Sequence, residues 1–280
     1  MMGTLASFCL MAIGARELNG QLDTFQVLFF RSAIGLLIIS MVIIPLRRPT
    51  LFSTNRIKLH TFRNVFHFAG QYGWFVGIGL LPLAEVFAIE FTVPVWTALI
   101  ACTFLGERLT ARKVLSILLG LTGVMVIVKP GIEIVSIASI TVLIAAICYA
   151  VSHVSTKGLS STEHPLTILF YMCLIQLPIG LVLSLGNWQL PIGIEWWWVA
   201  VLGVTALSAH YCMTKAMQSA EVTMVVTMDF LRLPIIALVG VLVYSESLEL
   251  SLFIGAALML LGNLVNMYQP NRKAGKMASR

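Results

Sequence analysis

A carboxylate and a proline interrupt an otherwise apolar stretch, FAIEFTVPVWTALIACTFLGE, at residues 87–107. Glu90 precedes Pro94 by about one helical turn. A charge at the centre of a membrane helix costs about 2.5–3.5 kcal/mol on insertion scales, and such residues usually face a water-filled cavity or a partner. The sequence therefore favours Glu90 as a contact for a substrate amine or as a proton-coupling carboxylate. The alternative is a structural role, in a buried pair or as a protonated carboxyl that donates to a backbone carbonyl.

The proline removes a hydrogen bond from the same helix. Pro94 cannot donate to the carbonyl four residues earlier, which belongs to Glu90. Freed carbonyls and kinks are tolerated in membrane helices where they line a cavity or meet a neighbouring helix. Pro234 lies in another apolar stretch, and its freed carbonyl belongs to Phe230. We expect kinks at both prolines, with the one at Pro234 acting as a simple bend.

Three further charges fall within apolar segments. Asp229 and Arg232 are three residues apart, hence on one helix face, where they can pair and lower each other's cost of insertion. A self-neutralising structural pair and a site for the two charges of a zwitterion are both compatible with this spacing. Arg31 could extend outward to the membrane surface, pair with Glu90 or brace the bundle.

Polar and aromatic side chains near the middle of apolar segments supply the remaining site candidates. Stacking faces combined with hydrogen-bond donors suit an amphipathic or ring-bearing solute. Packing between helices is the alternative for each residue. These candidates are Gln71, Trp74, Tyr149, His210 and Tyr211.

No metal, cofactor or catalytic motif accompanies these residues. His67, His153 and His210 lie in apolar segments, but the sequence contains no HExxH pair of zinc ligands and no Walker loop. It also contains no nucleophile elbow or paired set of catalytic acids. The cysteines fall in apolar segments and are expected to pack as small hydrophobic side chains: Cys9, Cys102, Cys148, Cys173 and Cys212. We expect neither an enzyme nor a bound metal or cofactor.

The elements that must position the candidates are membrane helices. The chain of 280 residues is 59% hydrophobic and 11% charged, whereas a soluble domain has about 25% charged residues. Apolar runs of about 20 residues, enough to cross a ~30 Å hydrocarbon layer, recur along the chain. We expect an all-α membrane protein with ten transmembrane helices, near residues 3–20, 24–46, 60–80, 82–105, 112–129, 135–156, 165–186, 195–217, 220–245 and 250–269.

The positive charges separate the two sides of this expected bundle. If the N-terminus is cytoplasmic, the outer connections contain only Arg16 and Lys129. The inner connections and the tail then contain Arg47, Arg48, Arg56, Lys58, Arg108, Arg112, Lys113, Lys157, Lys215, Arg272, Lys273, Lys276 and Arg280. Because Lys and Arg are enriched in cytoplasmic loops, both termini are predicted to be cytoplasmic. The net charge of +6 therefore indicates orientation in the membrane and not binding to nucleic acid.

The first segment starts at Met1 with neither a basic leader nor a small-residue cleavage site. We therefore expect no cleaved signal peptide. A chain with a few more residues before Met1 is also compatible with this sequence.

The chain also resembles itself. GQYGWFVGIGLLPLAEV at 70–86 aligns with ALSAHYCMTKAMQSAEV at 206–222, so that Trp74 corresponds to His210. We expect two repeats of five helices each, at 1–131 and 132–280. Because five is odd, the second repeat enters the membrane in the opposite orientation. Inverted repeats of this kind are typical of secondary transporters, whose site lies at the repeat interface near the midplane.

The two repeats differ in chemistry. Each carries a proline near the centre of its fourth helix, but Phe230 stands four residues before Pro234 where Glu90 precedes Pro94. The glutamate is therefore expected to have no acidic counterpart in the second repeat.

Several stretches resemble the drug/metabolite transporter superfamily, and specifically its ten-helix EamA family. They are FFRSAIGLL (29–37), LLPLAEVFAIEFTVPVWTALIACTFLGERLT (80–110), GLTGVMVIVKPG (120–131) and FLRLPIIALVGVLVYSES (230–247). The resemblance covers nearly the whole chain. It implies a 5+5 inverted repeat with a central cavity lined mainly by helices 1, 3, 4, 6, 8 and 9. It also places helix 2 away from the cavity, which favours a bracing role for Arg31.

These features predict a secondary active transporter in the inner (plasma) membrane. The expected substrate is a small polar or zwitterionic metabolite, such as an amino acid, moved by alternating access with proton coupling or exchange. A larger ring-bearing metabolite or vitamin is the alternative substrate. An intramembrane enzyme that uses His210 or Glu90 and a channel or passive receptor are alternatives from other classes. The direction of transport and the driving ion stay open.

Glycines recur in the last helix of each expected repeat. They are Gly120, Gly123, Gly255 and Gly262, and small residues of this kind permit close helix packing in membranes. Packing within the chain and formation of a homodimer are both compatible with them.

Overall fold

The computed structural model describes residues 1–128, 136–246 and 250–267, and its regular structure over these ranges is entirely helical. The expected charges at Lys129 and in the tail lie outside the described residues. The α-helices are α1 (Met2–Leu18), α2 (Thr24–Ile43), α3 (Ile57–Leu80), α4 (Leu83–Glu90), α5 (Val93–Phe104), α6 (Ala111–Val128), α7 (Ile137–Ser160), α8 (Pro165–Ser184), α9 (Glu195–Ser219), α10 (Val222–Met228), α11 (Arg232–Tyr244) and α12 (Leu250–Met267).

Every expected segment overlaps a helix, and two of them are divided. The segment at 82–105 is made of α4 and α5, and the segment at 220–245 is made of α10 and α11. Five stretches of the described chain are long and apolar enough to cross a membrane: Thr24–Leu46, Leu83–Phe104, Ile137–Ser160, Pro165–Asn187 and Val222–Tyr244.

The two divisions occur at the prolines but go further than a kink. Pro94 is the second residue of α5, and Pro234 is the third residue of α11. A proline is tolerated in the first turn of a helix, because the amide hydrogen that it lacks has no partner there in any case. Each segment therefore ends one helix and starts another. The chain passes through residues 91–92 in the first case and through a short 3₁₀ turn, Asp229–Leu231, in the second.

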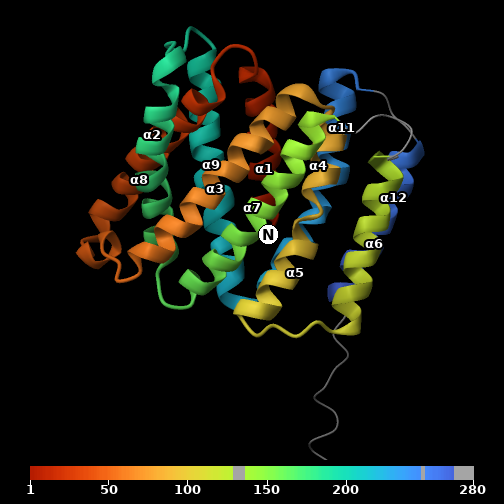
Figure 1. Cartoon of the computed structure of the whole chain (residues 1–280). Helices are drawn as coiled ribbons and strands as arrows, with labels where there is room; N and C mark the ends of the chain where they lie inside the picture. Colours follow the sequence, from red (N-terminus) through yellow and green to blue (C-terminus); the bar gives the residue numbers. More distant parts are fainter. Residues whose placement is uncertain (129–135, 247–249, 268–280) are drawn as a thin grey trace, which may run out of the picture.

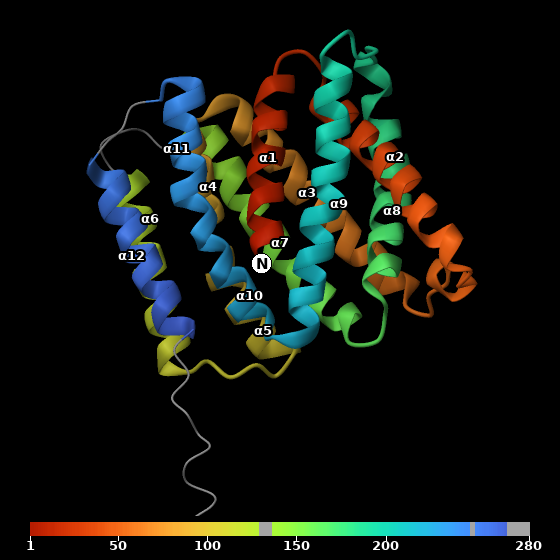
Figure 2. The ribbon, with the colours of Figure 1, turned by 180° about the vertical axis from the view of Figure 1, so that it is seen from behind.

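Helices from the two halves of the chain pack against each other throughout the bundle. α1 lies along α9, α2 along α8, α3 along α7 and α6 along α12, as Figures 1 and 2 show. In the centre, α4 contacts α11 and α5 contacts α10. The two divided segments thus lie side by side.

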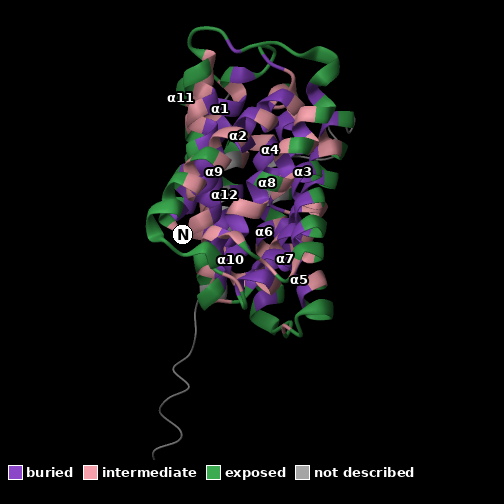
Figure 3. Cartoon of the chain, turned by 90° about the vertical axis from the view of Figure 1, so that its left-hand side faces the viewer, coloured by how far each residue is buried: buried purple, intermediate pink, exposed green. Residues whose placement is uncertain are grey.

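Small residues allow close approach of the helices at several of these pairs. At Gly73 of α3, a Cβ atom would come within 3.0 Å of the Thr141 carbonyl oxygen of α7, and at Gly262 of α12 one would come within 2.9 Å of the Ser116 carbonyl oxygen of α6. Gly262 is therefore used for packing within the chain. Buried residues run through the interior, and exposed ones lie on the connections at both ends and along the outer faces of the helices (Figure 3).

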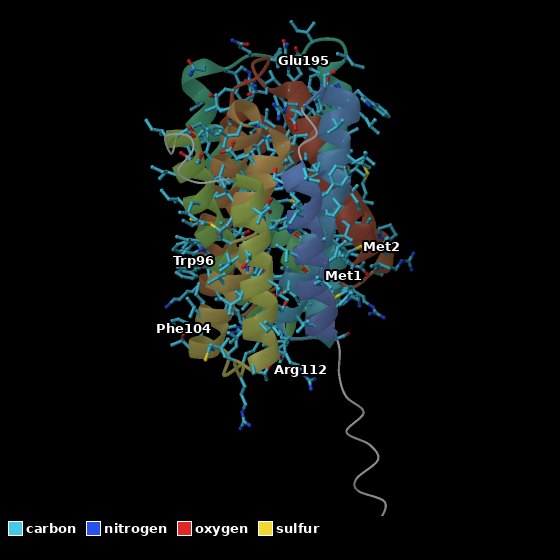
Figure 4. All side chains as sticks on the ribbon, turned by 90° about the vertical axis from the view of Figure 1, so that its right-hand side faces the viewer. Met1, Met2, Trp96, Phe104, Arg112 and Glu195 are labelled. Carbon is cyan, nitrogen blue, oxygen red and sulfur yellow. The ribbon has the colours of Figure 1, made fainter. Side chains whose placement is uncertain are left out.

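The ends of the molecule separate residues that the sequence assigns to different sides. Glu195 lies at one end, whereas Phe104 and Arg112 lie at the other (Figure 4). Met1 lies about midway between these ends, so α1 begins about halfway along the bundle and runs toward the end that holds Glu195.

Candidate functional site

A cavity lies at the centre of the bundle, beside the two divided segments. Its walls come from α1, α3, α4, α7, α9, α11 and the 3₁₀ turn between α10 and α11. These are the same segments that the resemblance implied. The lining residues are Phe8, Met11, Gln71, Trp74, Glu90, Tyr149, His153, His210, Met213, Asp229 and Arg232.

Three charged side chains meet at this cavity. Arg232 Nη2 donates to Glu90 Oε1 at 2.8 Å, and it also lies 2.9 Å from Asp229 Oδ2. The Arg232 side chain is only 2% exposed, against 12% for Glu90 and 11% for Asp229. Two carboxylates and one guanidinium leave a net charge of −1 when all three are ionised. We call Glu90, Asp229 and Arg232 the charged trio.

The helix divisions place the trio. Glu90 is the last residue of α4, Asp229 directly follows α10, and Arg232 is the first residue of α11. The expectation that Glu90 has no acidic counterpart needs correction, because Asp229 occupies the matching division in the second half. It stands one residue earlier than the spacing to the proline suggested. The two halves differ instead in positive charge, because only the division in the second half supplies an arginine to the cavity, Arg232.

Aromatic rings enclose the guanidinium of Arg232. Its central carbon lies 4.7 Å from the ring centroids of both Phe8 and Phe87. A guanidinium over an aromatic face is attracted by the ring quadrupole, by up to about 2 kcal/mol where water is excluded. These contacts hold Arg232 in place beside the two carboxylates, and all three side chains line the cavity.

Trp74 fixes the second oxygen of Glu90. The indole Nε1–H donates to Glu90 Oε2 at 2.8 Å, so each carboxylate oxygen of Glu90 accepts one bond from a different donor. Further rings line the cavity: Tyr149 stacks on His153 with ring centroids 6.2 Å apart, and His210 meets Phe8 edge-on at 5.5 Å.

Several polar atoms of the lining have no partner within the described chain. They are buried, and each could bond to a ligand: Gln71 Oε1, His210 Nε2, Asp229 Oδ1 and Arg232 Nε. A buried polar atom left without a hydrogen bond costs about 1–3 kcal/mol. The site therefore offers both donors and acceptors to a polar solute. Among the described residues, no group of three or more His, Cys, Asp or Glu could hold a metal ion.

The structure brings together most of the residues proposed from the sequence. Gln71, Trp74, Glu90, Tyr149, His210, Asp229 and Arg232 all line the cavity. Tyr211 does not; it packs beside a separate apolar cluster that includes Ile39 and Met172. Its neighbour His210 faces the cavity, and adjacent residues on a helix point about 100° apart.

The sequence reasoning missed four lining residues and one ion pair. Phe8, Met11, His153 and Met213 line the cavity. The spacing of two of them was a usable signal, because His153 is four residues after Tyr149 and Met213 is three after His210, which places each on the same helix face as its partner. Glu90 and Arg232 pair although they are 142 positions apart in the sequence, so no local pattern indicates their contact.

Two of the three roles expected for Arg31, extension to the membrane surface and pairing with Glu90, are wrong. Its side chain is buried, at 2% exposure, so it does not extend to the membrane surface. Its Nη2 donates to Gln176 Oε1 at 2.7 Å, and Glu90 is paired with Arg232 instead. The bracing role agrees with this contact between α2 and α8.

Each half of the chain also holds the start of a divided segment in the other half. Glu107, after α5, accepts from the Val222 backbone N–H at 2.8 Å and from Thr223 Oγ1 at 2.7 Å, at the start of α10. Glu246, after α11, accepts from the Leu83 backbone N–H at 3.0 Å, at the start of α4. Carboxylates stabilise helix N-termini by satisfying free N–H groups and by opposing the helix dipole.

Supporting cations complete both contacts. Lys113 Nζ lies 3.3 Å from Glu107 Oε2, and Arg16 Nη2 lies 3.1 Å from Glu246 Oε1. We call the contacts around Glu107 and Glu246 the two latches. They lie near opposite ends of the molecule.

A polar cavity with buried charges, set between interrupted helices in an apolar bundle, is typical of membrane transporters. The comparison with protein families agrees: the EamA-like transporter family matches residues 1–129 and 136–268. The chain belongs to this family. It is a multi-pass membrane protein of the drug/metabolite transporter type, a transporter and not an enzyme.

Relatives of this chain carry different substrate names. The S-adenosylmethionine uptake transporter of Rickettsia bellii is 22% identical over 262 residues, which cover 94% of this chain and 90% of the relative. The riboflavin transporter of Rhizobium johnstonii is 30% identical over 221 residues, covering 78% and 73%. The pseudopaline exporter CntI of Pseudomonas aeruginosa is 26% identical over 250 residues, covering 88% and 87%.

A solved structure shares the fold. A crystal structure of another protein superposes with a TM-score of 0.77 over 95% of this chain and 94% of that chain, at 18% sequence identity. At this identity the likeness concerns the fold alone.

Proposed function

We propose that this protein is a secondary transporter that carries a small zwitterionic metabolite across the inner membrane by alternating access. The observation that carries the proposal is the charged trio at the central cavity. Its net charge of −1 favours a cation at the cavity, and the amine of a metabolite or a proton can supply it. A neutral or purely anionic solute would leave this charge uncompensated in a low-dielectric site.

The lining suits a solute that also carries a flat ring. Trp74, Tyr149 and His210 present aromatic faces beside the free polar atoms of Gln71 and Asp229. S-adenosylmethionine, named for some relatives, combines an amine, a carboxylate and a purine ring. Riboflavin, named for others, is a ring-bearing vitamin without a cationic amine. The trio favours the first of these substrate classes.

The arrangement of the halves supports alternating access through a 5+5 inverted repeat of ten membrane segments. Exchanging the first five segments with the last five converts the pair α1–α9 into the pair α7–α3, and both pairs are present. The latches follow the same exchange, since each half closes the other near one end. Because both latches are formed, we interpret the structure as an occluded state, in which the release of one latch opens one side.

Counterflow into proteoliposomes tests the proposal. Vesicles that hold purified protein would be loaded with unlabelled methionine, S-adenosylmethionine or riboflavin and then exposed to the labelled compound. We expect saturable counterflow of an amine-bearing compound and none in vesicles without protein. Counterflow of riboflavin alone would contradict the zwitterion assignment, and non-saturable flux of all the compounds would indicate a channel.

A further inference from the structure

A second group of charges is buried away from the trio, between α2, α3, α7 and α8. Arg31 and Arg63 are each 2% exposed. Neither forms an ion pair with a carboxylate in the part of the chain that the structure describes. Two uncompensated guanidinium groups in the interior of a membrane bundle are expensive, so a missing counter-charge is expected.

Neutral side chains link the two arginines. Arg31 Nη2 donates to Gln176 Oε1 at 2.7 Å, and Arg63 Nη1 donates to Asn64 Oδ1 at 2.7 Å. Gln176 Nε2 lies 3.1 Å from Asn64 Oδ1 and 2.8 Å from His67 Nδ1. Because the amide oxygen of Gln176 accepts from Arg31, its nitrogen faces two acceptors, and His67 Nδ1 is one of them.

This assignment leaves only donors free. A neutral imidazole whose Nδ1 accepts carries its hydrogen on Nε2, and His67 Nε2 is buried without a partner. Arg31 Nε and Nη1 are also buried without partners among the described residues. The free atoms of the group are thus three donor nitrogens beside two positive charges, while the acceptor oxygens of Gln176 and Asn64 are already bonded.

The group borders the central cavity. The His67 ring lies 4.7 Å from the His210 ring and 5.9 Å from the Tyr149 ring, and both of these line the cavity. His210 Nε2 is a further buried polar atom without a partner among the described residues. A solute held at the trio therefore has a positively charged region next to it, separated only by these rings.

We propose that Arg31 and Arg63 form an oxyanion subsite that receives a carboxylate or phosphate group of the transported metabolite. Guanidinium groups recognise both groups through paired N–H donors. This inference rests on the proposed function: the trio takes the cationic end of the substrate and the arginines take its anionic end. Entry requires the rings of His210 and Tyr149 to move during the transport cycle.

Thermal unfolding of the purified full-length protein tests the subsite. Potassium phosphate or potassium acetate is titrated at constant ionic strength, balanced with potassium chloride. Because a ligand of the folded state raises its stability, we expect a saturable rise in Tm of about 2–4 °C. Arg31→Gln should abolish the rise. Arg48→Gln, at an exposed arginine in the loop after α2, should keep it.

A second variant guards against misfolding of Arg31→Gln. Gln176→Glu has nearly the same shape and places a carboxylate on Arg31, so the internal charge should replace the external anion and remove the Tm response. No response to either anion in the unmodified protein would overturn the proposal. So would a response that persists in both variants.

Transport separates this inference from the proposed function. With a compound that gives counterflow, we expect the carboxylate form to be preferred over its methyl ester by at least about tenfold in half-saturation, since a charge-assisted bond contributes about 1.5–3 kcal/mol. Gln176→Glu should lose the preference. If no compound gives counterflow but the anions still raise the Tm, the transport proposal is contradicted and the subsite is not. Counterflow without a Tm response or an ester preference contradicts the subsite alone, and uptake that requires free phosphate contradicts its assignment to the substrate.

Discussion

Arg232 is held between two carboxylates that come from different halves of the chain. Glu90 reaches it from the end of α4, and Asp229 reaches it from its own turn. Removing one partner of a buried ion pair is strongly destabilising when the other charge is left alone. Here a single neutralisation leaves Arg232 with the remaining carboxylate, so the trio can lose a charge without losing the fold. This property suits a group that exchanges a proton or an amine.

Neutralising Glu90 should therefore separate transport from stability. In Glu90→Gln, only one of the two oxygens remains to accept from Arg232 and Trp74, and the trio becomes neutral. We expect proton-driven uptake to fall about 10- to 100-fold, since a bond to a charged group contributes about 1.5–3 kcal/mol. The protein should still fold, with a Tm lower by a few degrees because one buried donor loses its acceptor. The measurement is uptake under an imposed pH gradient, combined with thermal unfolding.

Glu85→Gln is the matched control for this prediction. Glu85 lies in the first turn of the same helix and bonds to Ser139 Oγ at 3.1 Å, away from the cavity lining. The Glu85→Gln variant should show the uptake rate of the unmodified protein. Wild-type uptake by Glu90→Gln would rule out the coupling role.

At the scale of elements, the divided segments explain how charges come to lie in the interior. A continuous helix satisfies its own backbone groups, whereas a division exposes helix ends that need partners. The α4–α5 and α10–α11 divisions meet at the trio, and their outer starts are held by the latches. Each divided segment thus connects the trio at its middle to a latch at its outer start.

Weakening a latch should open one side of the transporter. Glu107→Gln removes the charge at the start of α10, and Glu246→Gln does the same for α4. Losing a helix cap costs about 0.5–2 kcal/mol, which shifts a two-state population by roughly 2- to 30-fold. A cysteine at Met213, in the cavity wall, should then react faster with a membrane-impermeant thiol reagent.

The two latch variants serve as controls for each other. With Glu107→Gln, reaction should increase only from the side that holds Arg112, and with Glu246→Gln only from the side that holds Glu195. Inside-out and right-side-out vesicles distinguish the sides. Equal increases from both sides would indicate general loosening and contradict the gating role.

Close packing of α3 on α7 gives a prediction about stability. In Gly73→Ala, the new Cβ would lie 3.0 Å from the Thr141 carbonyl oxygen and from Ala145 Cβ. Overpacking of this kind costs about 1–3 kcal/mol, so Tm should fall by several degrees. Gly158→Ala on α7 meets only Leu59 Cδ2 at 3.9 Å and should be neutral or stabilising, since alanine favours helix. Equal Tm values for the two variants would contradict the packing argument.

At the scale of the whole molecule, the pairing of helices across the halves joins the two halves of the chain into one bundle. The four most extensive helix pairs among the described residues, α1–α9, α2–α8, α3–α7 and α6–α12, all cross between halves. A rearrangement of one half therefore alters contacts along the entire bundle. This arrangement favours a concerted change between two states over independent motion of single helices.

Labelling of the loops tests the predicted orientation. Ser53 and Asn187 are both exposed, in the connections after α2 and α8. A cysteine at position 53 should react with an impermeant maleimide only from the cytoplasm, and one at 187 only from outside, because the basic loops are expected inside. The unmodified chain gives the background. Reaction of position 53 from outside would reverse the predicted topology.

The sequence by itself determined the membrane class, the family and the segments that line the site. Apolar runs, the positions of Lys and Arg, and the motifs around Glu90 and Pro234 are local signals, because each helix must satisfy its backbone and meet lipid on its own. Because these local signals identify the helices around the cavity, seven of the eight residues proposed for binding line it. Tyr211 is the exception.

Only the tertiary structure decided which charges meet. The bond from Arg232 to Glu90, the latches at Glu107 and Glu246, and the group around Arg31 join positions more than one hundred apart in the chain. Pairing energy depends on distance and on the exclusion of water, and neither is written in local spacing. The sequence could name the charges but not their partners, since those are chosen by the packing of one half against the other.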